Sequence, residues 1–279
     1  MKKFNIFHHI NQKTIDAMYN DYAPVFILST GRCGSRFVHQ LLSKSERAKS
    51  YHEAFPNLMY FSNYAYHNQE KRELLKMMIQ ASRMEFILAA YNENKIYMES
   101  NQCLSFFTPF LNDLFPKCKF IHLLRHPGDF VQSSIKKGWH LNDSIWESGR
   151  LKMQAPEWAD FSQVQKLAWL WARTNKYLSE ELSQMPPPRV LTLKTEDMFS
   201  NIEIVKKIYS FGDVPVPVSD RALKDLMNTP VNELLIHPDE PANMKKISNF
   251  PSYSEWSEEM KNELRQFVSP LGEKYGYAL

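Results

Sequence analysis

The turn between a short apolar segment and a helix constrains the fold of this chain most strongly. Val25–Leu28 predicts a fully buried strand, and Phe37–Leu42 predicts the helix that follows it. Between them, Gly31 and Gly34 allow the backbone to turn tightly and to approach an anion closely. We therefore expect an oxyanion site in residues 29–36, with side-chain donors from Arg32, Ser35 and Arg36.

A second strand–turn–helix unit follows the same plan. Lys119–Leu124 predicts a strand, residues 125–128 predict a break, and a helix is expected from Asp129 onward. Arg125 stands at the end of this strand, and Ser133 follows on the helix, so both are expected at the carboxyl edge of the sheet. Two separated anion sites on one sheet suit a nucleotide that is phosphorylated at both its 5′ and 3′ ends.

Strands and helices alternate along the chain. Further strands are predicted at residues 96–98 and 189–193, with helical patterns at 69–88, 162–182, 202–211 and 256–268. Such alternation implies a parallel sheet covered on both faces. We therefore predict an α/β fold, a P-loop-like three-layer sandwich with a central parallel sheet flanked by helices, in a single domain over residues 1–279.

The composition does not demand a nucleic-acid or membrane partner, and we expect no nucleic-acid partner. Lys and Arg total 34 against 31 Asp and Glu, a net charge of +3 that demands no polyanionic partner. Cys33, Cys103 and Cys118 are an odd number at wide spacings, which predicts a reducing cytoplasm and no disulfide framework. The histidines lack metal-ligand spacing, so no metal is expected. No signal peptide and no membrane span are predicted either.

The glycine-containing loop differs from two common nucleotide-binding motifs. A Walker A loop requires G-x-x-x-x-G-K-[ST], but Gly34 is followed by Ser35 and Arg36. The G-x-G-x-x-G pattern of dinucleotide-binding folds is missing too. An ATP-dependent small-molecule kinase and a non-catalytic nucleotide-binding module remain as alternative functions.

The sequence resembles the family of soluble, bacterial-type sulfotransferases that use 3′-phosphoadenosine-5′-phosphosulfate (PAPS). Residues 26–37, FILSTGRCGSRF, resemble the family's 5′-phosphosulfate loop, and residues 123–133 resemble its 3′-phosphate motif. Weaker similarity at 114–117, 189–197 and 256–277 extends the resemblance to about residues 24–279. Many relatives have lysine at the position of Arg32, and bacterial members often have an acidic-Lys-Thr-Pro run where this chain has residues 99–102.

The resemblance implies a sulfotransferase that moves the sulfuryl group of PAPS to a small polar acceptor, either a natural product or a sugar. The attacked atom would be a hydroxyl oxygen or an amine or guanidinium nitrogen, and the other product would be 3′-phosphoadenosine-5′-phosphate (PAP). No metal is implied. The residues implied to bind the donor are Gly31, Arg32, Cys33, Gly34, Ser35, Arg36, Phe37, Arg125 and Ser133.

Catalysis requires in-line placement of the nucleophile and stabilisation of the charge that develops on the bridging oxygen, by analogy with phosphoryl transfer. We predict that Arg32 stabilises this oxygen. A resting alcohol or amine also needs a proton acceptor. Glu53 is the first candidate, because residues 51–55 resemble the His-Glu-x-Phe segment of some relatives; His52 and Glu99 are the alternatives.

Residues 138–160 have no clean period and predict a long functional loop, an acceptor lid. Aromatic rings and carboxylates together suit a cationic or hydroxylated small molecule. A surface insertion whose tryptophans pack on the core is the alternative. The residues that suggest the lid are Trp139, Trp146, Trp158, Asp143, Glu147, Glu157 and Asp160.

Overall fold

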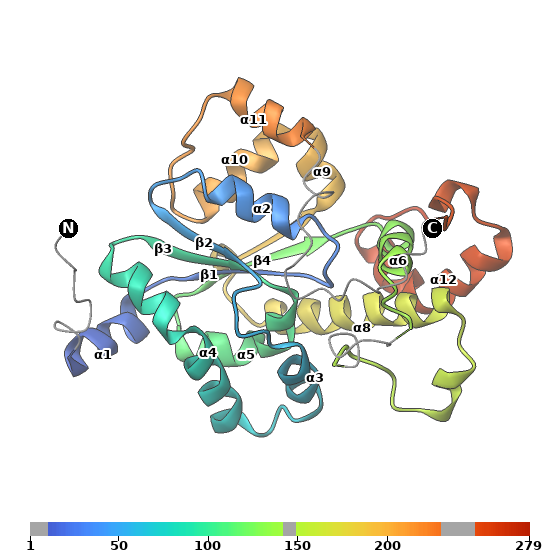
Figure 1. The fold of residues 1–279 in the computed structure, drawn as a ribbon, viewed down its shortest axis with the longest axis horizontal. Helices are drawn as coiled ribbons and strands as arrows, with labels where there is room; N and C mark the ends of the chain where they lie inside the picture. Colours follow the sequence, from blue (N-terminus) through green and yellow to red (C-terminus); the bar gives the residue numbers. More distant parts are fainter. Residues whose placement is uncertain (1–10, 142–148, 230–248) are drawn as a thin grey trace.

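Five parallel strands form the centre of the protein. The structure is a computed structural model that describes residues 11–141, 149–229 and 249–279. The strand order is β2-β3-β1-β4-β5, and every adjacent pair is parallel (Figure 1). The strands are β1 (Val25–Leu28), β2 (Ala48–His52), β3 (Ile96–Ser100), β4 (Lys119–Leu124) and β5 (Val190–Lys194).

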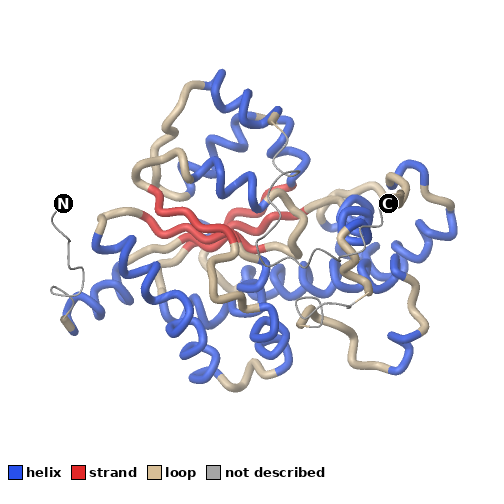
Figure 2. Tube along the Cα trace, viewed as in Figure 1, coloured by secondary structure: helices blue, strands red, loops and turns tan. Residues whose placement is uncertain are grey.

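Helices cover both faces of the sheet, which lies between two helical layers in Figure 2. One face carries α2 (Ser35–Leu42), α9 (Thr195–Ser200), α10 (Ile202–Phe211) and α11 (Asp220–Asn228). The helices of the other side are α1 (Gln12–Asp21), α3 (Met59–His67), α4 (Arg72–Asn92), α5 (Thr108–Leu114), α6 (Pro127–Lys136), α8 (Gln163–Ser183) and α12 (Glu258–Lys274). Short 3-10 helices are η2 (Gln102–Phe107), η3 (Pro156–Ala159), η4 (Pro187–Arg189) and η5 (Tyr253–Glu255).

Strand β1 shows why this sequence forms a covered sheet. Its side chains alternate between two apolar cores: Val25 and Ile27 join the core beneath α2 and α10, while Phe26 and Leu28 join the core on the opposite face. All four are at most 1% exposed, so the strand is apolar at every position rather than at every second one. The predicted α/β sandwich with a central parallel sheet is confirmed.

The predicted elements agree with the structure where the apolar pattern is strong. β1, β4 and α10 have the predicted bounds, whereas β3 continues two residues past the predicted end, to Ser100. The sequence did not predict β2. This strand lies at the edge of the sheet and consists of AKSYH, four of whose residues are only partly buried, so it lacks the apolar run of a central strand.

A buried ion pair fastens α4 to the sheet. Arg83 and Glu99 both have 0% exposed side chains, and Arg83 Nε donates to the two carboxylate oxygens at 3.0 and 2.8 Å. Tyr97 Oη donates to Glu99 at 2.6 Å, and Asn101 Nδ2 donates to it at 2.8 Å. Arg83 Nη1 also donates to the Pro56 carbonyl at 3.3 Å. The pair therefore anchors both the end of β3 and the loop that follows β2.

No helix in the described ranges is both long enough and apolar enough to cross a membrane.

We predict that Glu99→Gln lowers the free energy of unfolding by about 3 kcal/mol or more, because it leaves the Arg83 guanidinium buried without a counter-charge. Urea denaturation measures the change. The matched control is Glu93→Gln, which removes the exposed ion pair with Lys49 and is expected to cost about 1 kcal/mol or less. A Glu99→Gln loss no larger than the control's would contradict the anchoring role.

Candidate active site

The carboxyl ends of the strands bring the predicted site residues to one edge of the sheet. β1 leads into the loop at residues 29–34, β2 ends at His52, β3 ends at Ser100, and β4 leads into Arg125. Because all five strands are parallel, these ends share one edge, which is where open α/β sheets bind ligands.

The loop after β1 has a left-handed backbone at three of its positions. The φ angles are +82° at Gly31, +56° at Arg32 and +74° at Gly34. The left-handed region is costly for Arg32, and residues held in it often belong to functional sites. Gly34 is the N-cap of α2 and has no side chain to cap the first turn, which also contains no acidic residue. The N-terminus of α2 therefore suits an anion.

Gly31 also allows a close approach by other side chains. A Cβ atom at this position would lie 2.3 Å from Gln102 Oε1 and 2.8 Å from Trp139 Cη2. A side chain here would therefore displace both groups as well as strain the backbone.

Arg32, Ser133 and Arg125 bring the two predicted anion motifs into contact. Arg32 Nε donates to Ser133 Oγ at 2.9 Å, and Arg125 Nη1 donates to the Arg32 backbone carbonyl at 2.8 Å. These residues come from the loop after β1, from α6 and from the end of β4. Motifs about a hundred residues apart in the sequence thus share one cationic cluster.

The electrostatics of this cluster favour a bound anion. Burial lowers the pKa of Arg32, and the neighbouring Arg125 guanidinium lowers it further. Two guanidinium groups so close together repel each other, and a phosphate or sulfate beside them would relieve that repulsion. The donor set therefore fits an oxyanion.

Cys33 and Phe37 both have buried side chains. The Cys33 side chain is fully buried, and burial raises its pKa to about 11. Phe37 is 2% exposed and packs on Phe199 with ring centroids 4.7 Å apart. Ser35 and Arg36, in the first turn of α2, are partly exposed.

Thr195, the first residue of α9, links the two anion motifs through its side chain. This residue was not identified from the sequence. Its hydroxyl lies 2.9 Å from the Cys33 carbonyl oxygen and 2.7 Å from the Leu124 carbonyl oxygen. Since Cys33 belongs to the first motif and Leu124 precedes Arg125, this hydroxyl fixes their spacing. Its position directly after β5 was the available signal.

His52 and Glu53 lie beside the phosphate-type loop. His52 Nε2 and Ser35 Oγ are 3.2 Å apart, so the imidazole contacts the first turn of α2. Glu53 has a φ of +48°, and its carboxylate accepts a hydrogen bond of 3.0 Å from Gln102 Nε2. Both are partly exposed. Glu99, in contrast, is 0% exposed and its carboxylate accepts hydrogen bonds from Arg83, Tyr97 and Asn101. It therefore lies in the buried layer beneath the other candidate residues.

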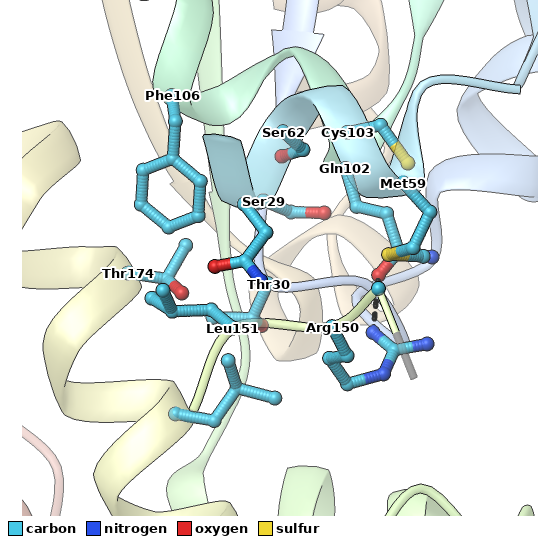
Figure 3. A pocket seen from close by; sticks show the side chains of 13 residues that line it. Ser29, Thr30, Met59, Ser62, Gln102, Cys103, Phe106, Arg150, Leu151 and Thr174 are labelled. Atoms are coloured by element: carbon cyan, nitrogen blue, oxygen red, sulfur yellow. Dashed lines mark hydrogen bonds between the residues drawn. The ribbon is translucent and has the colours of Figure 1, made fainter. Parts of the chain in front are cut away.

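A small pocket with both polar and apolar lining residues lies next to Gln102, the partner of Glu53 (Figure 3). Arg150 Nη1 donates to Gln102 Oε1 at 3.1 Å, and the Arg150 guanidinium stacks 3.4 Å from the centre of the Trp139 ring. The sequence did not single out either Arg150 or Gln102. The residues lining the pocket are Ser29, Thr30, Met59, Ser62, Asn63, Gln102, Cys103, Phe106, Gly149, Arg150, Leu151, Leu170 and Thr174.

The predicted acceptor lid lies partly outside the described residues, which exclude positions 142–148 and with them Asp143, Trp146 and Glu147. Trp139 is 8% exposed and lies against Gly31 of the loop. Trp158 packs on Trp169 and Phe161 and is not among the residues that line the pocket. Glu157 and Asp160 are exposed.

Over residues 11–141, 149–229 and 249–279, no group of three or more His, Cys, Asp or Glu side chains is arranged to hold a metal ion.

Several solved sulfotransferases have a similar fold. The sulfotransferase domain from the curacin biosynthetic pathway is 17% identical, with a TM-score of 0.51, and the match covers 92% of this chain and 99% of that one. Sulfotransferase STF9 from Mycobacterium avium is 11% identical, with a TM-score of 0.53 and coverage of 96% and 80%. A sulfotransferase from Alicyclobacillus acidocaldarius is 11% identical, with a TM-score of 0.50 and coverage of 92% and 97%. At these identities the likeness shows the fold alone.

Among curated proteins, no sequence matches this chain significantly. A family model described as the sulfotransferase domain, however, matches residues 23–270, which is most of the chain. The chain therefore belongs to the sulfotransferase family.

Proposed function

We propose that this protein transfers the sulfuryl group of PAPS to a hydroxyl group of a small polar acceptor. The observation that carries the proposal is the contact of Arg32 with Ser133 and of Arg125 with the Arg32 carbonyl, which joins two anion-binding motifs in one cluster. A donor phosphorylated at its 5′ and 3′ positions needs two such sites side by side. Membership of the sulfotransferase family supports the same donor.

The two motifs would hold different ends of the donor. The amides of the first turn of α2, with Ser35 and Arg36, suit the 5′-phosphosulfate, because this helix begins without a side-chain cap. Arg125 and Ser133 suit the 3′-phosphate, since a guanidinium group and a hydroxyl donate to phosphate oxygens.

Arg32 and Glu53 would carry the chemistry. During transfer, the acceptor oxygen bonds to sulfur, and the bond between sulfur and the 5′-phosphate oxygen breaks with its electron pair on that oxygen. Arg32, which stays largely buried, can stabilise the charge on this leaving oxygen. Glu53 can accept the acceptor's proton. The products are PAP and the sulfated acceptor.

Glu53 is favoured over the two other bases by its position. The hydrogen bond from Gln102 orients its carboxylate at the edge of the pocket. Glu99 is committed to its buried ion pair. His52 contacts Ser35 in the donor loop and stays the second candidate.

The pocket favours a hydroxylated acceptor over a cationic one. Hydroxyl and amide groups from Ser62, Asn63, Gln102 and Thr174 line it, together with the Arg150 guanidinium. The Arg150 guanidinium in this lining would repel a cationic acceptor, whereas its N–H groups can donate to a hydroxyl oxygen. A hydroxyl group of the acceptor therefore suits these groups better than a cationic group.

We predict that isothermal calorimetry without magnesium detects PAP binding, and that Arg125→Ala weakens it about 10- to 100-fold. The loss of charge-assisted hydrogen bonds to the 3′-phosphate is the reason. Binding of AMP, which lacks that phosphate, is expected to change about threefold or less. The control is Arg221→Ala, at an exposed position of α11. A wild-type protein that prefers Mg-ATP and ignores the 3′-phosphate would instead support a kinase.

We predict that Glu53→Gln lowers kcat for sulfuryl transfer by about 10²- to 10⁴-fold with little change in PAP affinity, because the amide cannot accept the proton. The acceptor is first found by incubating cell extracts with labelled PAPS and identifying the product by mass. Glu46→Gln makes the same charge change before the other end of β2 and is the control. Full activity in Glu53→Gln with a large loss in His52→Gln would assign the base to His52.

A further inference from the structure

Gln102 makes two side-chain hydrogen bonds, one of them to the candidate base, and it lines the pocket. Its Nε2 donates to Glu53 Oε1 at 3.0 Å, and its Oε1 accepts from Arg150 Nη1 at 3.1 Å. Its side chain also lines the small pocket, where Figure 3 shows it facing Arg150. One amide thus lies between the base, a guanidinium group and the pocket.

We propose that Gln102 is a positioning residue, which orients the Glu53 carboxylate and couples that orientation to the pocket. This inference rests on the proposed function, because it takes Glu53 as the proton acceptor. Gln102 stands at the position where the acidic-Lys-Thr-Pro run of many bacterial members has proline. A proline side chain could not make these hydrogen bonds, so the proposed role is specific to this chain.

The hydrogen-bonding capacities of the three side chains determine which way the amide points. Arginine carries only donors, so its contact with Gln102 must use the amide oxygen. The amide NH2 group is then turned toward Glu53, whose ionised carboxylate carries only acceptors. Arg150 therefore selects the one amide orientation that can hold Glu53.

The surroundings of Gln102 leave it little freedom to adopt another orientation. The backbone on either side is fixed, since Asn101 N donates to the Ile27 carbonyl at 3.0 Å and Cys103 N donates to Asn101 Oδ1 at 2.8 Å. Gly31 admits the amide oxygen so closely that a Cβ atom there would lie 2.3 Å from it. The Arg150 guanidinium, which donates to Gln102, stacks on Trp139 with its central carbon 3.4 Å from the ring centre.

This arrangement connects acceptor binding with the base. A hydroxylated molecule in the pocket would lie against Gln102, and the other end of the same amide holds Glu53. The carboxylate would thereby be presented to an acceptor in a defined direction, and such alignment is a large part of the benefit of general-base catalysis.

The test compares Gln102→Glu with Gln102→Met. Gln102→Glu replaces only the NH2 group by oxygen, so it keeps the size and the contact with Arg150 but repels the ionised Glu53. Gln102→Met keeps the length and removes both hydrogen bonds. Gln184→Met, at the exposed end of α8, is the control. For each purified full-length variant we would measure PAP affinity by calorimetry, the melting temperature, and kcat and KM for PAPS with the acceptor found in the extract screen.

We expect both Gln102 variants to lower kcat at least about tenfold while the KM for PAPS and the PAP affinity stay within about twofold. Gln102→Glu is expected to lose at least as much as Gln102→Met although it preserves the Arg150 contact. Wild-type kcat in Gln102→Glu would overturn the proposal, and so would a kcat loss matched by an equal loss of PAP affinity. Absence of PAP binding by the wild-type protein would instead remove the proposed function.

Discussion

The approach of two cationic residues, Arg32 and Arg125, at the carboxyl end of the parallel sheet favours a bound anion, and the other site residues lie around them. Arg125 reaches the backbone of Arg32, and the Arg32 side chain reaches Ser133 on α6. Burial prevents water from screening the repulsion between the two cations, as the lowered pKa of Arg32 reflects. A doubly phosphorylated nucleotide would supply the missing negative charge.

The layer beneath the site keeps this arrangement rigid. Thr195 holds the backbones of both anion motifs at a fixed spacing, and the buried pair of Arg83 and Glu99 holds the ends of β3 and the loop after β2. Since Gln102 follows β3 and Glu53 follows β2, the same ion pair supports the candidate base from below. Precise placement matters here, because in-line transfer tolerates little displacement of the reacting groups.

The fold and the site residues could be predicted from the sequence only where a short segment of the chain carries the pattern. The apolar runs of β1 and β4, the glycines of the first loop, and the paired positions of Arg125 and Ser133 are all readable within short segments. The polar edge strand β2 was missed because one of its sides has no neighbouring strand and little apolar cover. Gln102, Arg150 and Thr195 could not be assigned from spacing, since their partners lie 48 to 162 residues away. The sequence offers Glu99 as a possible base, and only the structure shows that the Arg83 guanidinium group pairs with it.

A crystal structure of the full-length protein with bound PAP would test the central claim most directly. The account predicts the 3′-phosphate within hydrogen-bonding distance of Arg125 and Ser133, and the 5′-phosphate at the N-terminus of α2 beside Arg32. PAP bound at another edge of the sheet, or with its 3′-phosphate directed into solvent, would contradict it.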